Sequence, residues 1–310
     1  MRVEHREPSV ASNRQFPALH VPGMLKKYGL HPSKSLGQNF LVDEHALQKV
    51  VNAADIQEDD VILEVGPGLG SLTRYLASAA RRVIAVELDK RLLPALHEIL
   101  SPFNNVELII GDILVLNPAQ LVTQEAYSPT KKENSRSSAS GNRSLPYKVV
   151  ANIPYYITSA LIRHLLEAEM RPESIVLMVQ REVASRIAAQ PPKMNLLALS
   201  VQAYGEPHIA AKIPAGAFYP PPKVDSAIVR IDLFPEARLP ASLRPLFFRL
   251  AKAGFSQKRK TLRNTISAGM HWDKTQAETL LHKAGINPQR RAQTLSFDEW
   301  ASLTRMAQGL

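Results

Sequence analysis

The tetrapeptide Asn152-Ile153-Pro154-Tyr155 combines a side-chain amide, a rigid imino acid and an aromatic ring directly after a strand-like run. The exocyclic amine of a nucleobase is a poor nucleophile because its lone pair is conjugated into the ring. The Asn152 oxygen and a backbone carbonyl fixed by Pro154 could accept both amine hydrogens and favour a pyramidal nitrogen. Tyr155 offers a face on which an extruded base could stack, an interaction worth roughly 1–3 kcal/mol. Taken alone, the tetrapeptide is more simply explained as a turn, so the prediction depends on the motifs around it.

A glycine-rich loop, Gly66-Pro67-Gly68-Leu69-Gly70, follows the apolar run Val61–Val65 and opens a helical stretch. Glycines at such a position permit a tight strand-to-helix turn and let the backbone approach a ligand closely. A dinucleotide-binding fingerprint would need a third glycine after two further residues, where this chain has Ser71. The loop therefore favours a nucleoside ligand without a pyrophosphate, with Gly66 and Gly68 as the expected contacts.

Two acidic residues mark the ends of the next two strand-like runs, because Glu87 ends Arg82–Val86 and Asp112 follows Val106–Ile110. The first carboxylate could accept both hydroxyls of a ribose, and the second could accept the exocyclic amine of an adenine. Either acid alone could be an ordinary residue of a surface loop. Parallel strands, however, bring their carboxyl ends to one edge of a sheet, where ligands bind. The acids and the glycine loop together therefore predict a site for S-adenosylmethionine.

The chemistry of that cofactor agrees with the residues found. The positive charge on its sulfur disappears as the methyl group is transferred, so no Asp or Cys base is required. Catalysis would then depend on positioning the amine and on dipoles directed at the developing ammonium.

These motifs require a sheet to position them. Apolar strand-like runs alternate with helical patterns, which predicts an α/β fold: a Rossmann-like core with a seven-stranded, mostly parallel sheet. The expected strands are Val61–Val65, Arg82–Val86, Val106–Ile110, Lys148–Ala151, Ser174–Val179 and Ala227–Ile231. The expected helices are 39–53, with Asp43 as the N-cap, 71–80, 90–100 and 159–168.

Composition divides the chain into a core and three further segments. Residues 1–30 are polar and unpatterned, which predicts a flexible N-terminal tail. The core, 31–237, is interrupted at about 123–146 by a stretch rich in Ser, Asn and charge, which predicts a mobile insertion. From 238 to 310 the pattern is helical and basic, which predicts a small all-α domain that binds RNA.

Positive charge is concentrated in the last quarter of the chain. The net charge is +10, of which residues 241–310 contribute +8, from 12 Lys and Arg against 4 Asp and Glu. Within this segment Lys258, Arg259, Lys260 and Arg263 fall inside ten residues. On a helix, Arg263 would share a face with Arg259 and Lys260, and such a face could bind phosphates. A solvated helix face is the alternative, but the local excess of charge favours RNA.

Composition also excludes several classes of protein. The chain has no cysteine, which excludes thiolate catalysis, disulfides and cysteine-bound metal centres. Its histidines show no metal-ligand spacing, so we expect no metal site. No apolar run reaches membrane-spanning length, and residues 1–16 lack the apolar core of a signal peptide. We therefore expect a cytoplasmic protein without a membrane partner.

Taken jointly, separated motifs make the sequence resemble the ribosomal RNA adenine N6-dimethyltransferase family, and within it the branch that acts on small-subunit RNA. The matching segments are 35–41 (Ser-Leu-Gly-Gln-Asn-Phe-Leu), Glu64–Gly70, Glu87, Gly111-Asp112, Asn152–Tyr155, 180–184, Phe218–Ser226 and Phe255–Asn264. The resemblance implies that S-adenosylmethionine is bound by Asn39, Leu41, Gly66, Glu87, Asp112 and Asn152. It also implies that the target adenine is held by Asn152, Pro154 and Tyr155, with Phe218 as a second stacking ring.

The same resemblance implies a substrate and a setting. It predicts N6-dimethylation of two adjacent adenines in the 3′-terminal hairpin loop of 16S RNA, within an immature small ribosomal subunit, by a monomer. A first alternative is the related enzyme that methylates an adenine of 23S RNA and confers macrolide resistance; segments Phe218–Ser226 and Phe255–Asn264 favour the small-subunit enzyme. A second alternative is a non-catalytic ribosome assembly factor, against which the set Gly66, Glu87 and Asn152 argues.

Overall fold

The computed structural model describes residues 16–123 and 146–308, and the chain divides into two compact units. The first unit comprises 1–181 and 209–233, and the second comprises 182–208 and 234–310. The sequence pattern predicts a single boundary after residue 237, whereas the structure assigns 182–208 to the same unit as the C-terminal helices. The insertion expected at about 123–146 lies outside the described residues, apart from its two ends.

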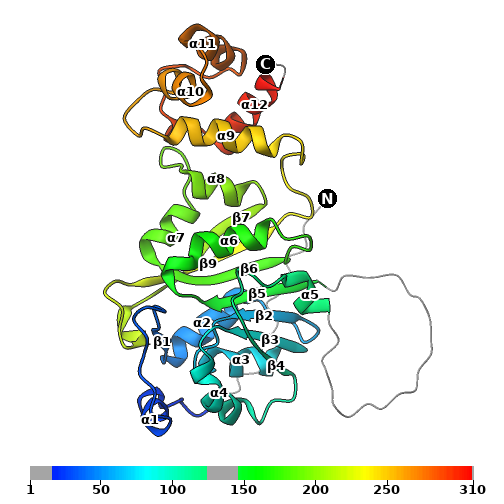
Figure 1. Cartoon of the computed structure of the whole chain (residues 1–310), viewed down its shortest axis with the longest axis vertical. Coiled ribbons are helices and arrows are strands. Elements are labelled where there is room, and N and C mark those ends of the chain that lie inside the picture. Colours follow the sequence, from blue (N-terminus) through cyan, green and yellow to red (C-terminus); the bar gives the residue numbers. More distant parts are fainter. Residues whose placement is uncertain (1–15, 124–145, 309–310) are drawn as a thin grey trace, which may run out of the picture. The chain divides into compact units, whose positions relative to one another are not determined.

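A seven-stranded sheet organises the first unit (Figure 1). Its strands are β2 (Val61–Val65), β3 (Arg82–Glu87), β4 (Val106–Ile110), β5 (Tyr147–Asn152), β6 (Ser174–Gln180), β7 (Gly205–Ile213) and β9 (Ser226–Leu233). They are arranged in the order β4-β3-β2-β5-β6-β9-β7. The pairs from β4 to β6 are parallel, and β9 is antiparallel to β6. The predicted α/β class with a mostly parallel sheet is confirmed.

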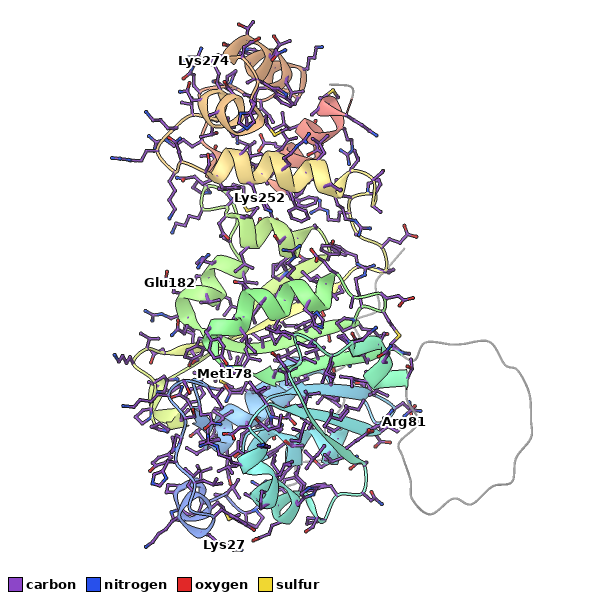
Figure 2. All side chains as sticks on the ribbon, viewed as in Figure 1. Lys27, Arg81, Met178, Glu182, Lys252 and Lys274 are labelled. Carbon is purple, nitrogen blue, oxygen red and sulfur yellow. The ribbon has the colours of Figure 1, made fainter. Side chains whose placement is uncertain are left out.

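The central strands are mostly apolar along their length because both faces of the sheet are covered. Every residue of β2 is buried, and Met178 of β6 lies at 0% exposure among the side chains of the sheet (Figure 2). The helices of this unit are α2 (Glu44–Ala54), α3 (Ser71–Ala79), α4 (Leu93–Leu100), α5 (Pro118–Thr123) and α6 (Thr158–Leu166), with short 3-10 turns η1 (Lys90–Leu92), η2 (Tyr155–Ile157) and η3 (Ala215–Ala217). These helices alternate with the parallel strands along the chain, as the sequence predicted.

Helix α2 begins later than the sequence pattern predicted. The Asp43 side chain caps it by accepting a hydrogen bond from the Ala46 amide at 2.7 Å, which agrees with the predicted cap. Residues 40–41, expected to be helical, instead form β1 (Phe40–Leu41), which pairs antiparallel with β8 (Phe218–Tyr219). The apolar side chains of β1 are buried through this distant pairing, a tertiary effect that local periodicity does not contain.

The prediction of a flexible tail over 1–30 is wrong for residues 16–30. Helix α1 (Val21–Lys27) buries Val21 and Leu25 in an apolar cluster with residues of α4. Phe16 packs edge-on against Tyr75, with 5.4 Å between ring centroids. The Pro17 carbonyl accepts a hydrogen bond from the Arg74 guanidinium at 3.0 Å. These contacts order 16–30, whereas residues 1–15 lie outside the described part of the chain.

The second unit contains the C-terminal helices that the sequence predicted. Its helices are α7 (Arg181–Ile187), α8 (Leu196–Gln202), α9 (Arg244–Phe255), α10 (Leu262–Met270), α11 (Lys274–Lys283) and α12 (Phe297–Ala307), with the 3-10 turn η4 (Ala292–Thr294). Trp300 of α12 is fully buried, and its ring centroid lies 5.6 Å from that of Phe255. Helix α12 begins with a capping box between Ser296 and Glu299. Among the described helices, none combines the length and apolar composition that crossing a bilayer would require.

Candidate active site

The carboxyl ends of β2, β3, β4 and β5 open into one pocket. Because these strands are adjacent and parallel, the loops that follow them lie at the same edge of the sheet. Nine predicted site residues line the pocket: Asn39, Leu41, Gly66, Gly68, Glu87, Asp112, Asn152, Pro154 and Tyr155. The fold therefore brings together motifs that are far apart in the sequence.

The loop after β2 has a backbone conformation that favours glycine. The φ angle is +70° at Gly66 and +62° at Gly68. A Cβ atom at Gly68 would also lie 3.0 Å from the ring of Phe40, closer than an ordinary van der Waals contact. The Gly66 amide donates to the Val86 carbonyl at 2.9 Å and so ties the loop to β3. The loop can thus present its main chain, unshielded by side chains, to a ligand.

Glu87 is held by backbone amides on both carboxylate oxygens. Its Oε2 accepts a hydrogen bond from the Gly68 amide at 3.0 Å, and its Oε1 accepts one from the Asp89 amide at 2.8 Å. Burial raises the pKa of Glu87, and these hydrogen bonds oppose the rise. Because each carboxylate oxygen has two acceptor positions, Glu87 keeps capacity for the hydroxyls of a ligand.

Asp112 differs from Glu87 in its exposure. It follows β4 and is exposed at the pocket, with its Oδ1 accepting a hydrogen bond from the Leu114 amide at 2.9 Å. The preceding Gly111 amide donates to the Glu87 carbonyl at 2.9 Å, which fixes the end of β4 against the end of β3. Among the described residues no hydrogen bond reaches the second oxygen of Asp112, so that oxygen is the one available to a ligand.

Glu64 is a buried acid to which the sequence analysis assigned no role, although it begins the glycine motif. It lies in β2, lines the pocket and is 1% exposed. Burial raises its pKa to about 8, and the nearby charge of Glu87 acts in the same direction. Its Oε2 has no hydrogen-bond partner among the described residues. A buried acid with one free oxygen, next to a second acid, favours a ligand that is positively charged or donates hydrogen bonds. The signal in the sequence was a single acid within an otherwise apolar strand.

Asn152 lies at the end of β5 and joins two segments of the pocket. Its Nδ2 donates to the Asn39 carbonyl at 3.1 Å, and the Asn39 side chain in turn donates to the Gly37 carbonyl at 3.1 Å. One of the two N–H groups of the Asn152 amide is therefore used within the protein, and this bond sets the orientation of the amide. Its amide oxygen is the part of the side chain left to accept a hydrogen bond from a substrate.

Tyr155 is held at both its ends. The hydroxyl lies 2.9 Å from the Ser226 hydroxyl on β9, and the backbone carbonyl accepts a hydrogen bond from the Thr158 hydroxyl at 3.0 Å. Pro154, with φ of −58°, precedes the 3-10 turn η2 that carries this ring. Burial raises the pKa of the Tyr155 hydroxyl, so the ring stays neutral at physiological pH. A fixed, neutral ring in the pocket is suited to stacking.

Phe218 does not lie with the other predicted catalytic residues. It is 3% exposed, belongs to the apolar core and is not part of the pocket lining. The cause is the β1–β8 pairing, which sets Phe218 opposite Leu41. Tyr156, which the sequence analysis did not select, lines the pocket and is 62% exposed. Its position directly after Tyr155 was the available signal.

The basic segment of the second unit is a turn rather than the helix that was expected. Lys258, Arg259 and Lys260 are exposed between the end of α9 and the start of α10. Arg263 belongs to α10 and forms an ion pair with Glu278 at 3.2 Å. The prediction that these residues share one face of a helix is therefore wrong. The turn instead exposes three unshielded cations that are consecutive in the chain.

Comparison with known sequences reveals close relatives. The model of the family "Ribosomal RNA adenine dimethylase" matches residues 30–308. The chain is 45% identical to the ribosomal RNA small subunit methyltransferase A of Dehalococcoides mccartyi, over 97% of each chain. It is 39% identical to the protein of the same name from Alkaliphilus metalliredigens, over 91% of this chain and 94% of that one.

Solved structures with the same fold align with most of this chain. The structure of the 23S rRNA methyltransferase ErmE is 27% identical and aligns with a TM-score of 0.67, covering 86% of this chain and 99% of that chain. A dimethyladenosine transferase from Plasmodium falciparum aligns with a TM-score of 0.66 at 24% identity, covering 85% of this chain and 95% of that one.

Proposed function

Because the chain belongs to the ribosomal RNA adenine dimethylase family, we propose that it transfers methyl groups from S-adenosylmethionine to N6 of two adjacent adenines of 16S RNA. The adenines would lie in the 3′-terminal hairpin loop of an immature small ribosomal subunit, and the enzyme would act in the cytoplasm as a monomer. One observation carries the proposal: Asn152, Pro154 and Tyr155 line the same pocket as Gly66, Glu87 and Asp112.

The pocket has the features that S-adenosylmethionine requires. Gly66 and Gly68 present main chain to the ligand, and Glu87 retains acceptor positions for the ribose hydroxyls. Asp112 would accept a hydrogen bond from the adenine amine of the cofactor. Glu64 offers a buried oxygen without a partner among the described residues, which suits a ligand of positive charge. Asn39, Leu41 and Asn152 would complete the binding site. When bound, this cofactor supplies a methyl group on a positively charged sulfur.

The residues of the chain itself would prepare the adenine. Asn152 would accept one amine hydrogen through its side-chain oxygen, because its nitrogen is engaged with Asn39. A main-chain carbonyl of the tetrapeptide would accept the other, since Pro154 limits the freedom of the loop. Tyr155, fixed through Ser226, would stack on the base. An adenine in a single-stranded loop would be extruded at low cost, because it has no paired strand to leave.

The small-subunit substrate is favoured over its 23S counterpart by the extent of the similarity. Identity reaches 45% over 97% of the chain for a small-subunit enzyme, against 27% for the 23S enzyme of known structure. The exposed cations of the turn, Lys258, Arg259 and Lys260, would contact phosphates of the RNA. Arg263 would contribute less to RNA binding, because it forms an ion pair with Glu278. A non-catalytic assembly factor would not need the cofactor features of the pocket.

The proposal is tested by methylation of purified small subunits that lack the modification. With labelled S-adenosylmethionine, we expect label in small-subunit RNA, mapped by primer extension to two adjacent adenines near its 3′ end. Large subunits treated in the same way should remain unlabelled. Label in 23S RNA alone would overturn the choice of substrate, and subunit binding without any label would indicate an assembly factor.

A further inference from the structure

One wall of the pocket is a short segment that belongs to no helix of the first unit. Residues 36–39 line the pocket, and 33–39 precede β1. The segment is folded locally: the Gly37 amide donates to the Lys34 carbonyl, and the Gln38 amide donates to the Ser33 carbonyl, both at 3.1 Å. Such a turn shapes the segment itself, but it does not attach the segment to the sheet.

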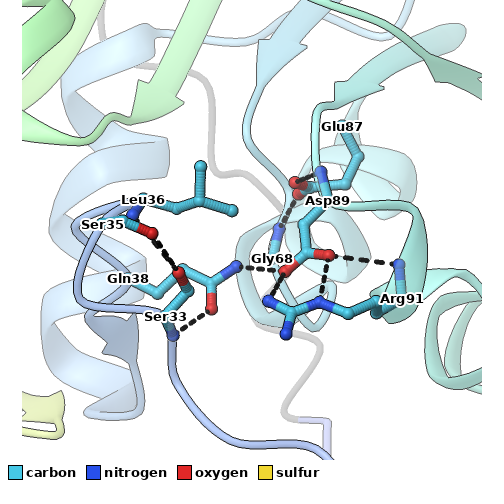
Figure 3. A network of polar contacts seen from close by, with 8 residues as sticks. All are labelled: Ser33, Ser35, Leu36, Gln38, Gly68, Glu87, Asp89 and Arg91. Carbon is cyan, nitrogen blue, oxygen red and sulfur yellow. Dashed lines mark hydrogen bonds and ion pairs between the residues drawn. The ribbon is translucent and has the colours of Figure 1, made fainter.

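Apart from the bond that the Asn39 carbonyl accepts from Asn152, the attachment is made by the side chain of Gln38 (Figure 3). Its Oε1 accepts a hydrogen bond from the Ser33 amide at 2.7 Å, and its Nε2 donates to Asp89 Oδ2 at 2.9 Å. In the described part of the chain, no other residue of 33–38 makes a hydrogen bond to a segment outside 33–39. Gln38 therefore both closes the turn and joins it to the loop after β3.

The surroundings of Asp89 favour this hydrogen bond. It is 6% exposed, and its carboxylate also accepts hydrogen bonds from the Arg91 side chain at 2.7 and 2.8 Å. The bonds from Arg91, followed by the bond from Gln38, lower the pKa of Asp89 and keep the carboxylate charged. A charged acceptor strengthens the bond from the Gln38 amide.

The same loop continues to the cofactor residues. The Asp89 amide donates to Glu87 Oε1 at 2.8 Å, and the other oxygen of Glu87 accepts from the Gly68 amide at 3.0 Å (Figure 3). One chain of hydrogen bonds thus connects three walls of the pocket: the 33–39 segment, the end of β3 and the glycine loop.

We propose that Gln38 and Asp89 form a clasp that holds the 33–39 segment in place as a wall of the cofactor pocket. Gln38 is thereby a positioning residue for cofactor binding, acting through Asp89 and Glu87 rather than on the methyl group. The inference rests on the proposed function, because it assumes that this pocket holds S-adenosylmethionine. Opening the clasp should weaken cofactor binding and leave the transfer step at saturating cofactor nearly unchanged.

The test compares four variants: Gln38→Ala, Gln38→Glu, Asp89→Asn, and Gln38→Glu with Asp89→Asn. The dissociation constant of S-adenosylhomocysteine is measured by calorimetry, together with KM for S-adenosylmethionine and kcat on small subunits. A hydrogen bond to a charged group is lost in Gln38→Ala, so we expect about a tenfold rise in the dissociation constant and in KM, with kcat within about twofold. Gln38→Glu should bind S-adenosylhomocysteine still more weakly, because it places two carboxylates next to each other.

The double variant provides the decisive comparison. A glutamate at 38 can accept a hydrogen bond from the amide of an asparagine at 89, so the double variant should bind several-fold more tightly than Gln38→Glu alone. Gln48→Ala is the matched control, since Gln48 makes a comparable side-chain bond, to Asn52 at 2.8 Å, on the exposed surface of α2. It should bind as the wild type does.

The outcomes separate the clasp from the proposed function. If Gln38→Ala and Gln38→Glu bind S-adenosylhomocysteine like the wild type, the clasp is refuted while the function stands. If the double variant binds no better than Gln38→Glu, the Gln38–Asp89 bond is not the cause and the clasp is likewise refuted. If the wild type itself binds neither S-adenosyl compound, the proposed function fails and the clasp fails with it.

Discussion

The side-chain nitrogen of Asn152 donates a hydrogen bond to the backbone carbonyl of Asn39, over 3.1 Å, although the two residues are 113 positions apart in the chain. This bond couples the end of β5 to the segment that leads into β1. It also determines which end of the Asn152 amide is left for a substrate. The orientation of one side chain thus depends on a partner contributed by a remote part of the sequence.

Asn152→Ala should abolish methyl transfer without preventing RNA binding. The variant loses the acceptor for the substrate amine, and removal of one such group typically costs about 10²–10³ in rate. The measurement is methyl incorporation into small subunits beside a filter-binding assay with the same RNA. Asn52→Ala, on the exposed face of α2, is the control and should behave as the wild type. Turnover of Asn152→Ala within tenfold of normal would contradict the role assigned to this residue.

Glu87→Gln should weaken cofactor binding by roughly ten- to a hundredfold, because it removes a charged acceptor that the backbone holds in place. The amide group would also set a donor against the donating amides of Gly68 or Asp89. Calorimetry with S-adenosylhomocysteine measures the loss. Glu58→Gln, an exposed acid of the same unit, serves as the reference and should have no effect. Equal affinity of Glu87→Gln and the wild type would exclude Glu87 from ribose binding.

Stability of the cofactor-free protein should fall as the pH rises from about 4.5 to about 8, because of Glu64. Over this range the unfolded chain has released the proton of this acid, whereas the folded chain still binds it, so a rise in pH favours unfolding. Glu64→Gln removes this dependence and should be more stable than the wild type at pH 8, by on the order of 4 kcal/mol. Urea unfolding at pH 5.5, 7 and 8.5 measures the difference. A gap between the two proteins that does not widen with pH would show that Glu64 ionises normally.

Replacing Lys258, Arg259 and Lys260 together by Ala should weaken RNA binding and reduce its salt dependence. Each phosphate contact contributes a little under one unit to the slope of log affinity against log salt, so we expect a slope shallower by about two to three. Arg263→Ala should have a smaller effect because its charge is paired with Glu278. Lys274→Ala, an exposed lysine at the start of α11 (Figure 2), is the comparison within the same unit. If Lys274→Ala lost as much RNA affinity as the triple variant, the turn that carries Lys258, Arg259 and Lys260 would have no special role in RNA binding.

Phe218→Ala should act mainly on stability. Removal of a fully buried phenylalanine typically costs about 3–5 kcal/mol, and Phe218 packs in the core. Thermal unfolding of this variant should therefore show a clear loss. The neighbouring Tyr219→Ala should have a small effect, since Tyr219 is 39% exposed. If Phe218→Ala kept its stability and lost only turnover, the ring would be a stacking partner for the base after all.

The edge of the sheet was predictable because its signals are local. Apolar runs such as Val61–Val65 and Arg82–Val86 mark buried strands, and the residues directly after parallel strands must meet at one edge. Gly66 and Glu87 could therefore be placed in one pocket without knowledge of a single contact. The need for glycine at Gly66 and Gly68 was also predictable from the sequence, since a positive φ angle at these positions is a property of the backbone of that turn.

The errors fall where a long-range partner overrides the local pattern. Phe16 and Val21 lack a helical or strand-like period, yet they are ordered by packing onto other elements. Phe218 has the residue type of a stacking ring, but pairing of β8 with β1 buries it. Arg263 counts as a cation in the sequence, whereas an ion pair with Glu278 offsets its charge in the structure.

The sequence by itself determined the α/β class, the family, the order of the motifs and the residue types that could bind a nucleoside and hold an amine, because each of these is encoded in neighbouring residues. Only the tertiary structure decided which groups are free to act: the oxygen rather than the nitrogen of Asn152, the Glu64 oxygen that has no partner among the described residues, the exposed Tyr156, and the Gln38–Asp89 bond. The reason is physical. Exposure, hydrogen-bond partners and the pKa of a buried acid are set by atoms distant in the chain, and they exist only once the chain has folded.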